Sequence, residues 1–193
     1  MTAPPPTAPG SPQVDFRDAA ADDFKAILAL NAESVHFLSP LDAPRLQRLH
    51  VHAAYHRVVA IDGVVAAFLL AFREGLDYDS PNYRWFAQRY AHFLYVDRIV
   101  VGAAQQGRRL GALLYDDIIA FAAASGVGEL TCEFDLEPPN PASARFHARY
   151  GFREVGRQWL GCGKKQVSLQ VRAIESAAVE SGMIAAQFFG ERA

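Results

Sequence analysis

Residues 105–111, QQGRRLG, combine glutamine, glycine and arginine in a way that suits the binding of a phosphate group. They follow a β-branched and aromatic stretch, FLYVDRIVV at 93–101, and precede an amphipathic stretch that predicts a helix. A helix begins with backbone N–H groups that have no intrahelical acceptor, and its dipole is positive at that end. Together with the guanidinium groups of Arg108 and Arg109, these donors predict a site for a phosphate or pyrophosphate.

Three kinds of phosphate loop can be compared with this segment. A Walker loop ends in Lys followed by Ser or Thr, and a dinucleotide fingerprint has three glycines at fixed spacing; the segment has neither. It does resemble motif A of the GNAT acetyltransferases, which reads Gln/Arg-x-x-Gly-x-Gly/Ala after a strand that ends in Val. Val101, Gln106 and Gly111 match this pattern, whereas Arg109 occupies the position of the first Gly.

A second segment, PPNPASARFHARYGF at 138–152, resembles motif B of the same family. The positions that match are Asn140, Ser143, Gly151 and Phe152. The segment follows another strand-like run at 130–136, so a helix and a strand separate the two motifs. Because motif A and motif B occur in the order that the family has, residues 14–173 resemble a GNAT domain. The fold implied is a single α/β domain with a mixed, mostly antiparallel sheet, splayed at the signature strand and flanked by helices on both faces.

The resemblance implies that acetyl-CoA is the cosubstrate. In the family, the pyrophosphate rests on the N–H groups of the loop, and the pantetheine arm runs along the signature strand. The backbone N–H near Val101 would then polarise the thioester carbonyl. The residues that the resemblance assigns to the cofactor are Ile99, Val100, Val101, Gln106, Gly107, Arg108, Arg109, Leu110, Gly111, Ala112, Asn140, Ser143 and His147.

Position 147 departs from the family. A Tyr seven residues after the motif B Asn normally protonates the CoA thiolate, and the same count from Asn140 reaches His147. An imidazole with a reference pKa near ~6.5 can give or take a proton at neutral pH, so His147 is a candidate for the acid. The alternative is that it only bonds the cofactor or nearby backbone while water is the acid. Tyr150, one helical turn on, is expected to pack near Phe152.

Transfer of an acetyl group to an amine also needs a base for the amine proton. Glu133 and Asp135 share one face of the strand at 130–136, and Asp97 lies on the signature strand. Each could instead be a surface charge or, for Asp97, an ion pair with Arg98. We prefer Glu133 as the catalytic base, because a charge in the middle of this strand needs a partner or a reason.

The family places the acceptor beside the segment that joins the first two helices. The residues there that become candidates for the acceptor site are Asn31, Glu33, Ser34 and Phe37, and a purely structural turn is an equal alternative. Asp97 is a further candidate for contact with the acceptor. Acidic side chains at Glu33, Asp97 and Glu133 favour a small, cationic amine. A protein N-terminus or a lysine side chain is the alternative acceptor.

Around these motifs the pattern predicts alternating strands and helices. The expected elements are strand 14–17, a helix from about Asp22 to Asn31, a helix capped by Asp42 that ends near His52, a hairpin over 57–73 turned at Asp62-Gly63, a helix at 141–150, and strands 152–160 and 165–172. Residues 74–92 form a long connection with five aromatic side chains. They are either a lid over the acceptor pocket or a loop whose aromatics pack on the sheet.

Composition narrows the class of protein. A chain of 193 residues suits one folded domain, and a net charge of -2 gives no general attraction to nucleic acid or anionic membranes. No apolar run is long enough to span a bilayer, and no signal peptide is evident. The two cysteines, Cys132 and Cys162, suggest neither a disulfide framework nor a metal site, so we expect a cytoplasmic protein without metal. We expect a Pro-rich tail at 1–13 and a helical extension at 174–193, which packs on its own domain or on a second copy in a homodimer.

The sequence thus predicts an acetyltransferase in which a small-molecule amine attacks acetyl-CoA directly in a ternary complex, since no activated Cys or Ser nucleophile is evident. The alternative is a non-catalytic acyl-CoA-binding or interaction module, which the substitutions at Arg109 and His147 keep open. A nucleotide- or nucleic-acid-binding protein is a third interpretation, which the acidic net charge disfavours.

Overall fold

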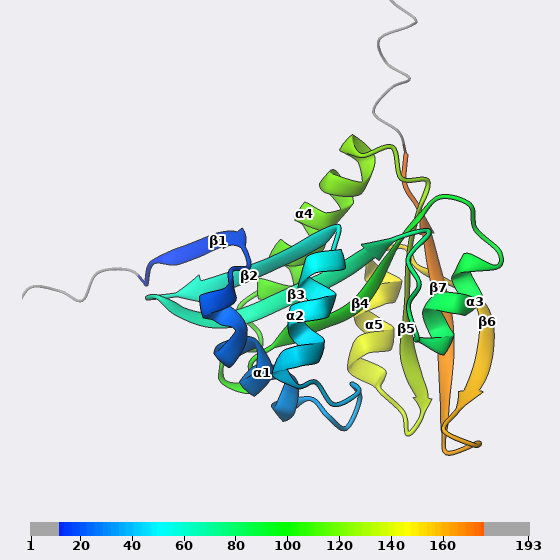
Figure 1. The fold of residues 1–193 in the computed structure, drawn as a ribbon, viewed down its shortest axis with the longest axis horizontal. Coiled ribbons are helices and arrows are strands. Elements are labelled where there is room, and N and C mark those ends of the chain that lie inside the picture. The colour runs from blue at the N-terminus through cyan, green and yellow to red at the C-terminus, as the bar shows by residue number, and fades with distance from the viewer. Residues whose placement is uncertain (1–11, 176–193) are drawn as a thin grey trace, which may run out of the picture.

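The structure is a computed structural model, and it describes residues 12–175. Within them a single sheet has the strand order β1-β2-β3-β4-β5-β7-β6 (Figure 1). The strands are β1 (Val14–Asp18), β2 (Tyr55–Ile61), β3 (Val64–Arg73), β4 (Phe93–Val101), β5 (Glu129–Glu137), β6 (Arg153–Leu160) and β7 (Lys165–Ala173). Neighbouring strands are antiparallel except for the parallel pair β4 and β5. The predicted mixed, mostly antiparallel sheet is confirmed.

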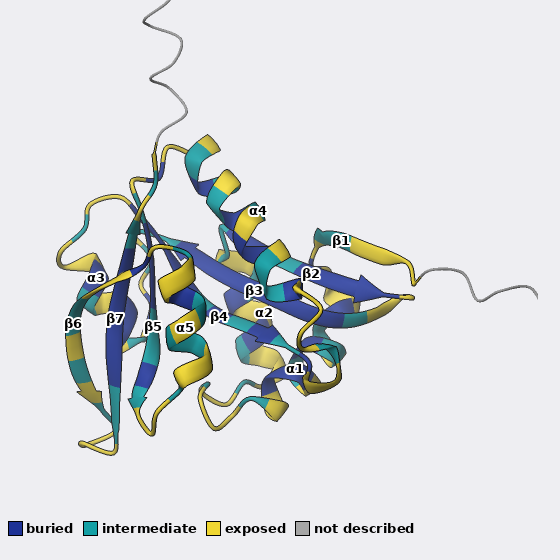
Figure 2. Ribbon diagram, turned by 180° about the vertical axis from the view of Figure 1, so that it is seen from behind, coloured by how far each residue is buried: buried dark blue, intermediate teal, exposed yellow. Residues whose placement is uncertain are grey.

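Helices cover both faces of this sheet, as the sequence predicted. They are α1 (Phe24–Glu33), α2 (Ala43–His52), α3 (Pro81–Ala87), α4 (Leu110–Ala124) and α5 (Pro141–Arg149). The first three pack on one face, and α4 and α5 pack on the other, which is turned toward the viewer in Figure 2. In the described part of the chain, no helix has both the length and the apolar character needed to cross a membrane.

The predicted turn and cap signals operate as their chemistry suggests. Asp62 and Gly63 both adopt positive φ angles, 51° and 79°, which a tight two-residue hairpin between β2 and β3 requires. The side chain of Asp42 accepts a hydrogen bond of 2.7 Å from the backbone N–H of Arg45 and so caps α2. Local sequence therefore sets both of these boundaries.

The segment 74–92 differs from the prediction, because it contains α3. The side chain of Ser80 caps this helix and Pro81 occupies its first turn, a combination that favours helix initiation. With only seven residues, α3 is too short to show an amphipathic repeat in the sequence. Tyr83 and Phe86 are buried against the sheet, so these aromatic side chains belong to the core.

Strands β4 and β5 pair only where they begin. Three residue pairs join them, from Phe93 with Glu129 to Tyr95 with Thr131. Beyond these pairs the strands separate, and β5 continues its pairing on its other edge with β7. The predicted splay at the signature strand is thus present, and it leaves one edge of β4 without a neighbouring strand.

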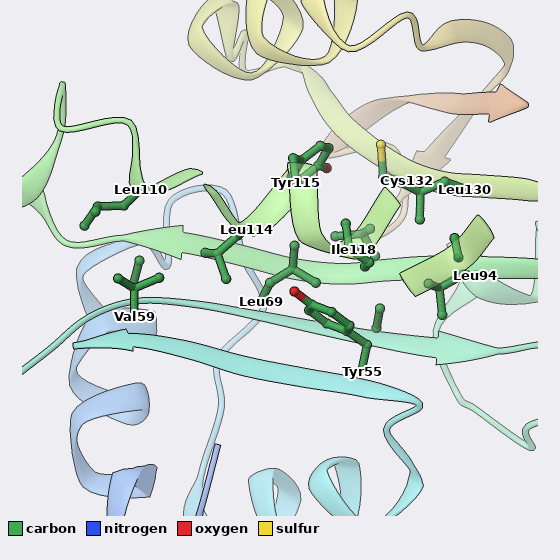
Figure 3. Packing of buried hydrophobic residues seen from close by; sticks show 14 of the residues in the cluster. Tyr55, Val59, Leu69, Leu94, Leu110, Leu114, Tyr115, Ile118, Leu130 and Cys132 are labelled. Atoms are coloured by element: carbon green, nitrogen blue, oxygen red, sulfur yellow. The ribbon is translucent and has the colours of Figure 1, made fainter. Parts of the chain in front are cut away.

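The core on the α4 side fixes the helix that follows the glycine-rich loop, which is residues 105–111. Leu114, Tyr115 and Ile118 of α4 are fully buried against β3, β4 and β5 (Figure 3). Burial of each large apolar side chain contributes roughly 1.5–3 kcal/mol. The position of α4 is therefore set by packing and does not depend on a ligand. The predicted tail at 1–13 and extension at 174–193 lie, apart from their inner ends, outside the described residues.

Candidate active site

A cavity of about 530 Å³ opens where β4 and β5 separate. Its walls come from both strands, the loop before α4, the beginning of α5 and the segment after α1. A second cavity of about 230 Å³ lies beside the beginning of α3. Both cavities are lined by Phe37, Leu38, Asn82, Asp97, Arg98, Glu133 and Lys165, so they adjoin one another.

The glycine-rich loop forms one end of the larger cavity. Gln106, Gly107 and Gly111 line it. The first intrahelical bond of α4 runs from the N–H of Leu113 to the carbonyl of Arg109 at 3.0 Å. The N–H groups before Leu113 therefore belong to the positive end of the helix. This arrangement suits the predicted contact with a pyrophosphate.

Arg109 immediately precedes α4 and has a left-handed backbone, with φ 63° and ψ 16°. Glycine adopts this conformation without strain, whereas a side chain disfavours it. The usual glycine of motif A thus has a physical reason here, and the arginine satisfies the same geometry at some cost in strain. Arg108 donates to the side chain of Gln105 at 2.6 Å.

The other predicted cofactor residues fall into two groups. Those that line the large cavity, besides the three loop residues, are Ile99, Val100, Val101, Asn140, Ser143 and His147. Those that do not line it are Arg108, Arg109, Leu110 and Ala112. Leu110 is buried in the core, and the carbonyl of Ala112 accepts from the hydroxyl of Tyr150 at 3.2 Å. A bound phosphate could reach these last four residues only through the backbone or by movement of the arginine side chains.

Glu133 lies between the two cavities and lines both. Its Oε1 accepts hydrogen bonds from Asn82 Nδ2 at 2.6 Å and from the Tyr95 hydroxyl at 3.0 Å. Its Oε2 is buried and has no partner among the described residues. Burial raises the pKa of this carboxyl to about 8, and the two hydrogen bonds only partly oppose the shift. Glu133 is thus a carboxyl that can exchange a proton near neutral pH.

The other two acidic candidates are neutralised by cations. Asp97 accepts from Arg98 Nε and from the Tyr78 hydroxyl, both at 2.7 Å, and both members of the ion pair are buried. Asp135 pairs with Lys165 Nζ at 2.9 Å. The alternative that gave Asp97 an ion pair with Arg98 is therefore the one seen. Asp135 shares two features with Glu133, since burial raises its pKa and its Oδ2 is buried without a partner among the described residues. Glu133 differs from both carboxyls because no described cation forms an ion pair with it.

His147 is buried in the wall of the larger cavity, and both of its ring nitrogens have partners. Nδ1 lies 2.8 Å from the carbonyl oxygen of Ser143, and Nε2 lies 2.7 Å from the Tyr115 hydroxyl. Burial lowers the pKa of the imidazole to about 4, so the ring is neutral at pH 7. A carbonyl can only accept, so with this bond made Nδ1 carries the proton and Nε2 accepts. In this tautomer His147 has no proton to offer the cavity.

Some of the predicted acceptor residues line a cavity and others do not. Ser34 lines the larger cavity, and Phe37 and Asp97 line both cavities. Asn31 and Glu33 line neither. The buried Asn31 accepts from Arg98 Nη1 at 2.7 Å, and Glu33 accepts from the N–H of Ala103 at 3.3 Å. Neither side chain faces a cavity in this structure, which fits the alternative of a structural turn, and contact with the acceptor stays a prediction for both.

Several residues of the site were not found from the sequence. They are Asn82 and Tyr95, which bond Glu133, Lys165, which bonds Asp135, and Tyr115, which bonds His147. The first three reach the site from distant strands and from α3, and no local motif marks them. Tyr115 did leave a signal, because it lies four residues after Gly111 and thus on the same helical face.

Comparison with known proteins gives a family match and a named relative. The family model described as "Acetyltransferase (GNAT) family" matches residues 17–152. A phosphinothricin N-acetyltransferase of Streptomyces coelicolor is 40% identical over 58 residues, which are 30% of this chain and 33% of that protein. The chain thus matches about a third of that relative's length.

Solved structures share the fold. One is an acetyltransferase of the GNAT family from Streptococcus pneumoniae, with a TM-score of 0.65 at 21% identity, covering 84% of this chain and all of that one. Another is a Salmonella typhimurium protein solved with its cofactor acetyl-CoA, with a TM-score of 0.65 at 18% identity, covering 86% of this chain and 96% of that one. At these identities the likeness concerns the fold alone.

Proposed function

Because the chain belongs to the GNAT family of acetyltransferases, we propose that it transfers the acetyl group of acetyl-CoA to a small-molecule amine. The amine attacks the thioester directly while both substrates are bound. The observation that carries this proposal is the cavity between β4 and β5, with the glycine-rich loop at one end and Glu133 at the border of the second cavity.

The fit of acetyl-CoA rests on the free edge of β4. Beyond Tyr95 this strand pairs with β3 but not with β5, so backbone groups at 99–101 can bond the amides of the pantetheine arm. The loop N–H groups from Gln106 to Gly111 would hold the pyrophosphate, and Arg108 and Arg109 would add positive charge. Asn140 and Ser143 line the same cavity near the beginning of α5.

Glu133 is the proposed general base. An amine must lose a proton before or during its attack, and a carboxylate with a pKa near the working pH is suited to accept it. The unpartnered Oε2 is the atom that would receive this proton. Direct attack is favoured over a covalent relay, because burial raises the pKa of the Cys132 thiol well above its usual value and so suppresses the nucleophilic thiolate.

The second cavity is the proposed acceptor site. Its acidic side chains are largely neutralised, since Asp97 pairs with Arg98 and Asp79 pairs with Arg45. These paired carboxylates give little reason to expect a cationic acceptor. We therefore propose a small amine, whether or not it carries further positive charge. The volume of about 230 Å³ suits a small molecule. The similarity to a phosphinothricin N-acetyltransferase, whose named substrate is a small molecule, supports the same choice.

Isothermal titration with acetyl-CoA and with CoA, followed by thiol-release assays on a panel of amines, tests the proposal. We expect binding of both ligands and thiol release with some of the small amines. Binding without release on small amines, on peptide N-termini or on lysine peptides would favour the non-catalytic acyl-CoA-binding module. Absence of binding would refute the interpretation of the loop before α4.

A further inference from the structure

We propose that the Tyr115 hydroxyl delivers the proton to the departing CoA sulfur, and that His147 is the positioning residue that holds this hydroxyl. The inference rests on the proposed acetyl transfer and deepens it. It moves the acid from α5, where the family has its tyrosine, to the neighbouring helix α4.

The first support is the position of Tyr115. Its side chain is fully buried, yet it lines the larger cavity together with Cys132 and His147. Figure 3 shows the ring of Tyr115 beside Cys132. Cys132 is the first residue of β5 beyond the last pair with β4, so the hydroxyl lies near the point where the cavity begins.

The second support is that the ring of Tyr115 is held firmly. Its neighbours are the rings of Phe146, Tyr150 and Phe152, with centroids 4.7, 5.1 and 6.0 Å away. The hydroxyl in turn lies 2.7 Å from His147 Nε2. A fixed ring with one hydrogen-bond partner keeps a donor in place without reorganisation, as catalysis by preorganised groups requires.

The third support is the state of His147. The carbonyl of Ser143 engages Nδ1–H, Tyr115 engages Nε2, and burial lowers the pKa of the ring to about 4. A tyrosine side chain is longer than a histidine side chain, so a tyrosine at position 147 would carry its hydroxyl farther from the backbone than Nε2 lies. The Tyr115 hydroxyl lies one hydrogen bond beyond Nε2 and so supplies from α4 a hydroxyl like the one that α5 lacks.

The network has a second arrangement that frees the hydroxyl for the sulfur. Ser143 Oγ lies 3.1 Å from His147 Nδ1, and its O–H can donate there when the imidazole proton resides on Nε2. In that tautomer Nδ1 gives up its hydrogen bond to the Ser143 carbonyl, Nε2–H donates to the oxygen of Tyr115, and the O–H of Tyr115 can turn to the sulfur. The same Nε2–H would stabilise the tyrosinate formed by proton transfer.

The proton balance closes with the groups already named. The amine nitrogen forms a bond to the carbonyl carbon and loses a proton to Glu133, while the carbon–sulfur bond breaks and its electron pair goes to sulfur. The O–H bond of Tyr115 breaks, its proton goes to sulfur, and the product is the CoA thiol. Protonated Glu133 then returns the proton that it took from the amine, and this proton reaches the tyrosinate through water. No further reactant is needed.

The test compares Tyr115→Phe with Tyr150→Phe. Both variants lose one hydroxyl from the same aromatic cluster, but the Tyr150 hydroxyl bonds Asp116 and the Ala112 carbonyl and does not line the cavity. The probe is CoA itself, and the measurement is the ultraviolet absorbance of its thiolate during a pH titration of the complex. A donor that faces the sulfur stabilises the thiolate. We therefore expect the pKa of the bound thiol to rise by about one unit in Tyr115→Phe, which is about a tenfold decrease of its acid dissociation constant.

Three further readouts make the test decisive. CoA affinity at a pH where the thiol is neutral should be unchanged in both variants. In Tyr115→Phe alone, kcat should fall by about 10²-fold or more, the lower end of the range for a general acid, with KM for acetyl-CoA unchanged. Thermal unfolding reports whether each variant is folded. His147→Gln should give a smaller rise of the bound thiol pKa, because it removes the positioning contact and keeps the hydroxyl, and it serves as the test if Tyr115→Phe does not fold.

An equal bound-thiol pKa in the wild type and Tyr115→Phe, or an equal change in Tyr150→Phe, would refute the role of Tyr115. If the wild type binds CoA and transfers the acetyl group under these outcomes, the proposed function stands and only this inference fails. If the wild type does not bind CoA, both are refuted.

Discussion

Glu133→Gln gives a direct test of the proposed base. The glutamine keeps an oxygen that accepts from Asn82 and Tyr95 but cannot take a proton from the amine. General-base catalysis contributes typically about 10²–10⁴-fold, so we expect a fall in kcat of that order. Affinity for acetyl-CoA should change little, because the predicted cofactor contacts lie on β4, the loop and α5.

The pH profile follows from the pKa of about 8. A base with this pKa is ionised in about one molecule in ten at pH 7 and about one in a hundred at pH 6. The acceptor-dependent kcat/KM should therefore rise about tenfold per pH unit and level off above pH 8. An amine that is already neutral at pH 6, such as an arylamine, separates this titration from that of the acceptor. The rise should be absent in Glu133→Gln.

Stability supplies a second measurement that needs no acceptor. Burial raises the pKa of Glu133 from an unfolded value near 4.5 to about 8, so the native state holds its proton over this range after the unfolded state has lost it. Stability therefore falls as pH rises from about 4.5 to 8, by up to about 1.4 kcal/mol per pH unit. Urea unfolding of Glu133→Gln should lack this component.

Glu129→Gln is the matched control, since Glu129 lies on the same strand at the end that pairs with β4 and lines neither cavity. It should keep the activity and both pH profiles of the wild type. A wild-type rate that is already level at pH 6, or a Glu133→Gln variant with unchanged kcat, would show that Glu133 is not the base.

The remaining predictions concern stability. Burial lowers the pKa values of His56 and His147 to about 4, so the unfolded chain binds more protons than the native state below about pH 6.5. The free energy of unfolding should therefore fall as pH drops from about 6.5 to 4. Urea unfolding of His147→Gln should show a smaller fall. Gly156→Ala would place Cβ 2.7 Å from Trp85 Cζ2 and should cost about 1–3 kcal/mol, whereas Gly128→Ala, whose nearest neighbour is 3.9 Å away, should cost less; equal losses would contradict the packing argument. Arg109→Gly should raise the thermal midpoint by relieving about 1 kcal/mol of left-handed strain, and a lowered midpoint would contradict it.

The elements that local patterns encode were predictable. Asp62-Gly63 forms a hairpin turn through its own backbone preferences, and Asp42 caps a helix through its own side chain. Glu133 could be singled out because an acidic group inside an apolar strand demands an explanation. Its surroundings could not be predicted, since Asn82 is 51 residues away and Tyr95 is 38 residues away along the chain. Such contacts depend on strand order and on a short helix that no sequence period reveals.

Two substitutions in the family motifs, Arg109 and His147, leave room for a non-catalytic module, and the structure shows the surroundings of each. Arg109 adopts the left-handed backbone that the motif needs, so the loop keeps its form without the glycine. His147 is accompanied by a tyrosine hydroxyl at 2.7 Å from the adjacent helix. On the proposal made for Tyr115, the loss of the α5 tyrosine is a relocation of the acid. On this proposal neither substitution speaks for the non-catalytic module, and thiol release on the amine panel distinguishes the two functions.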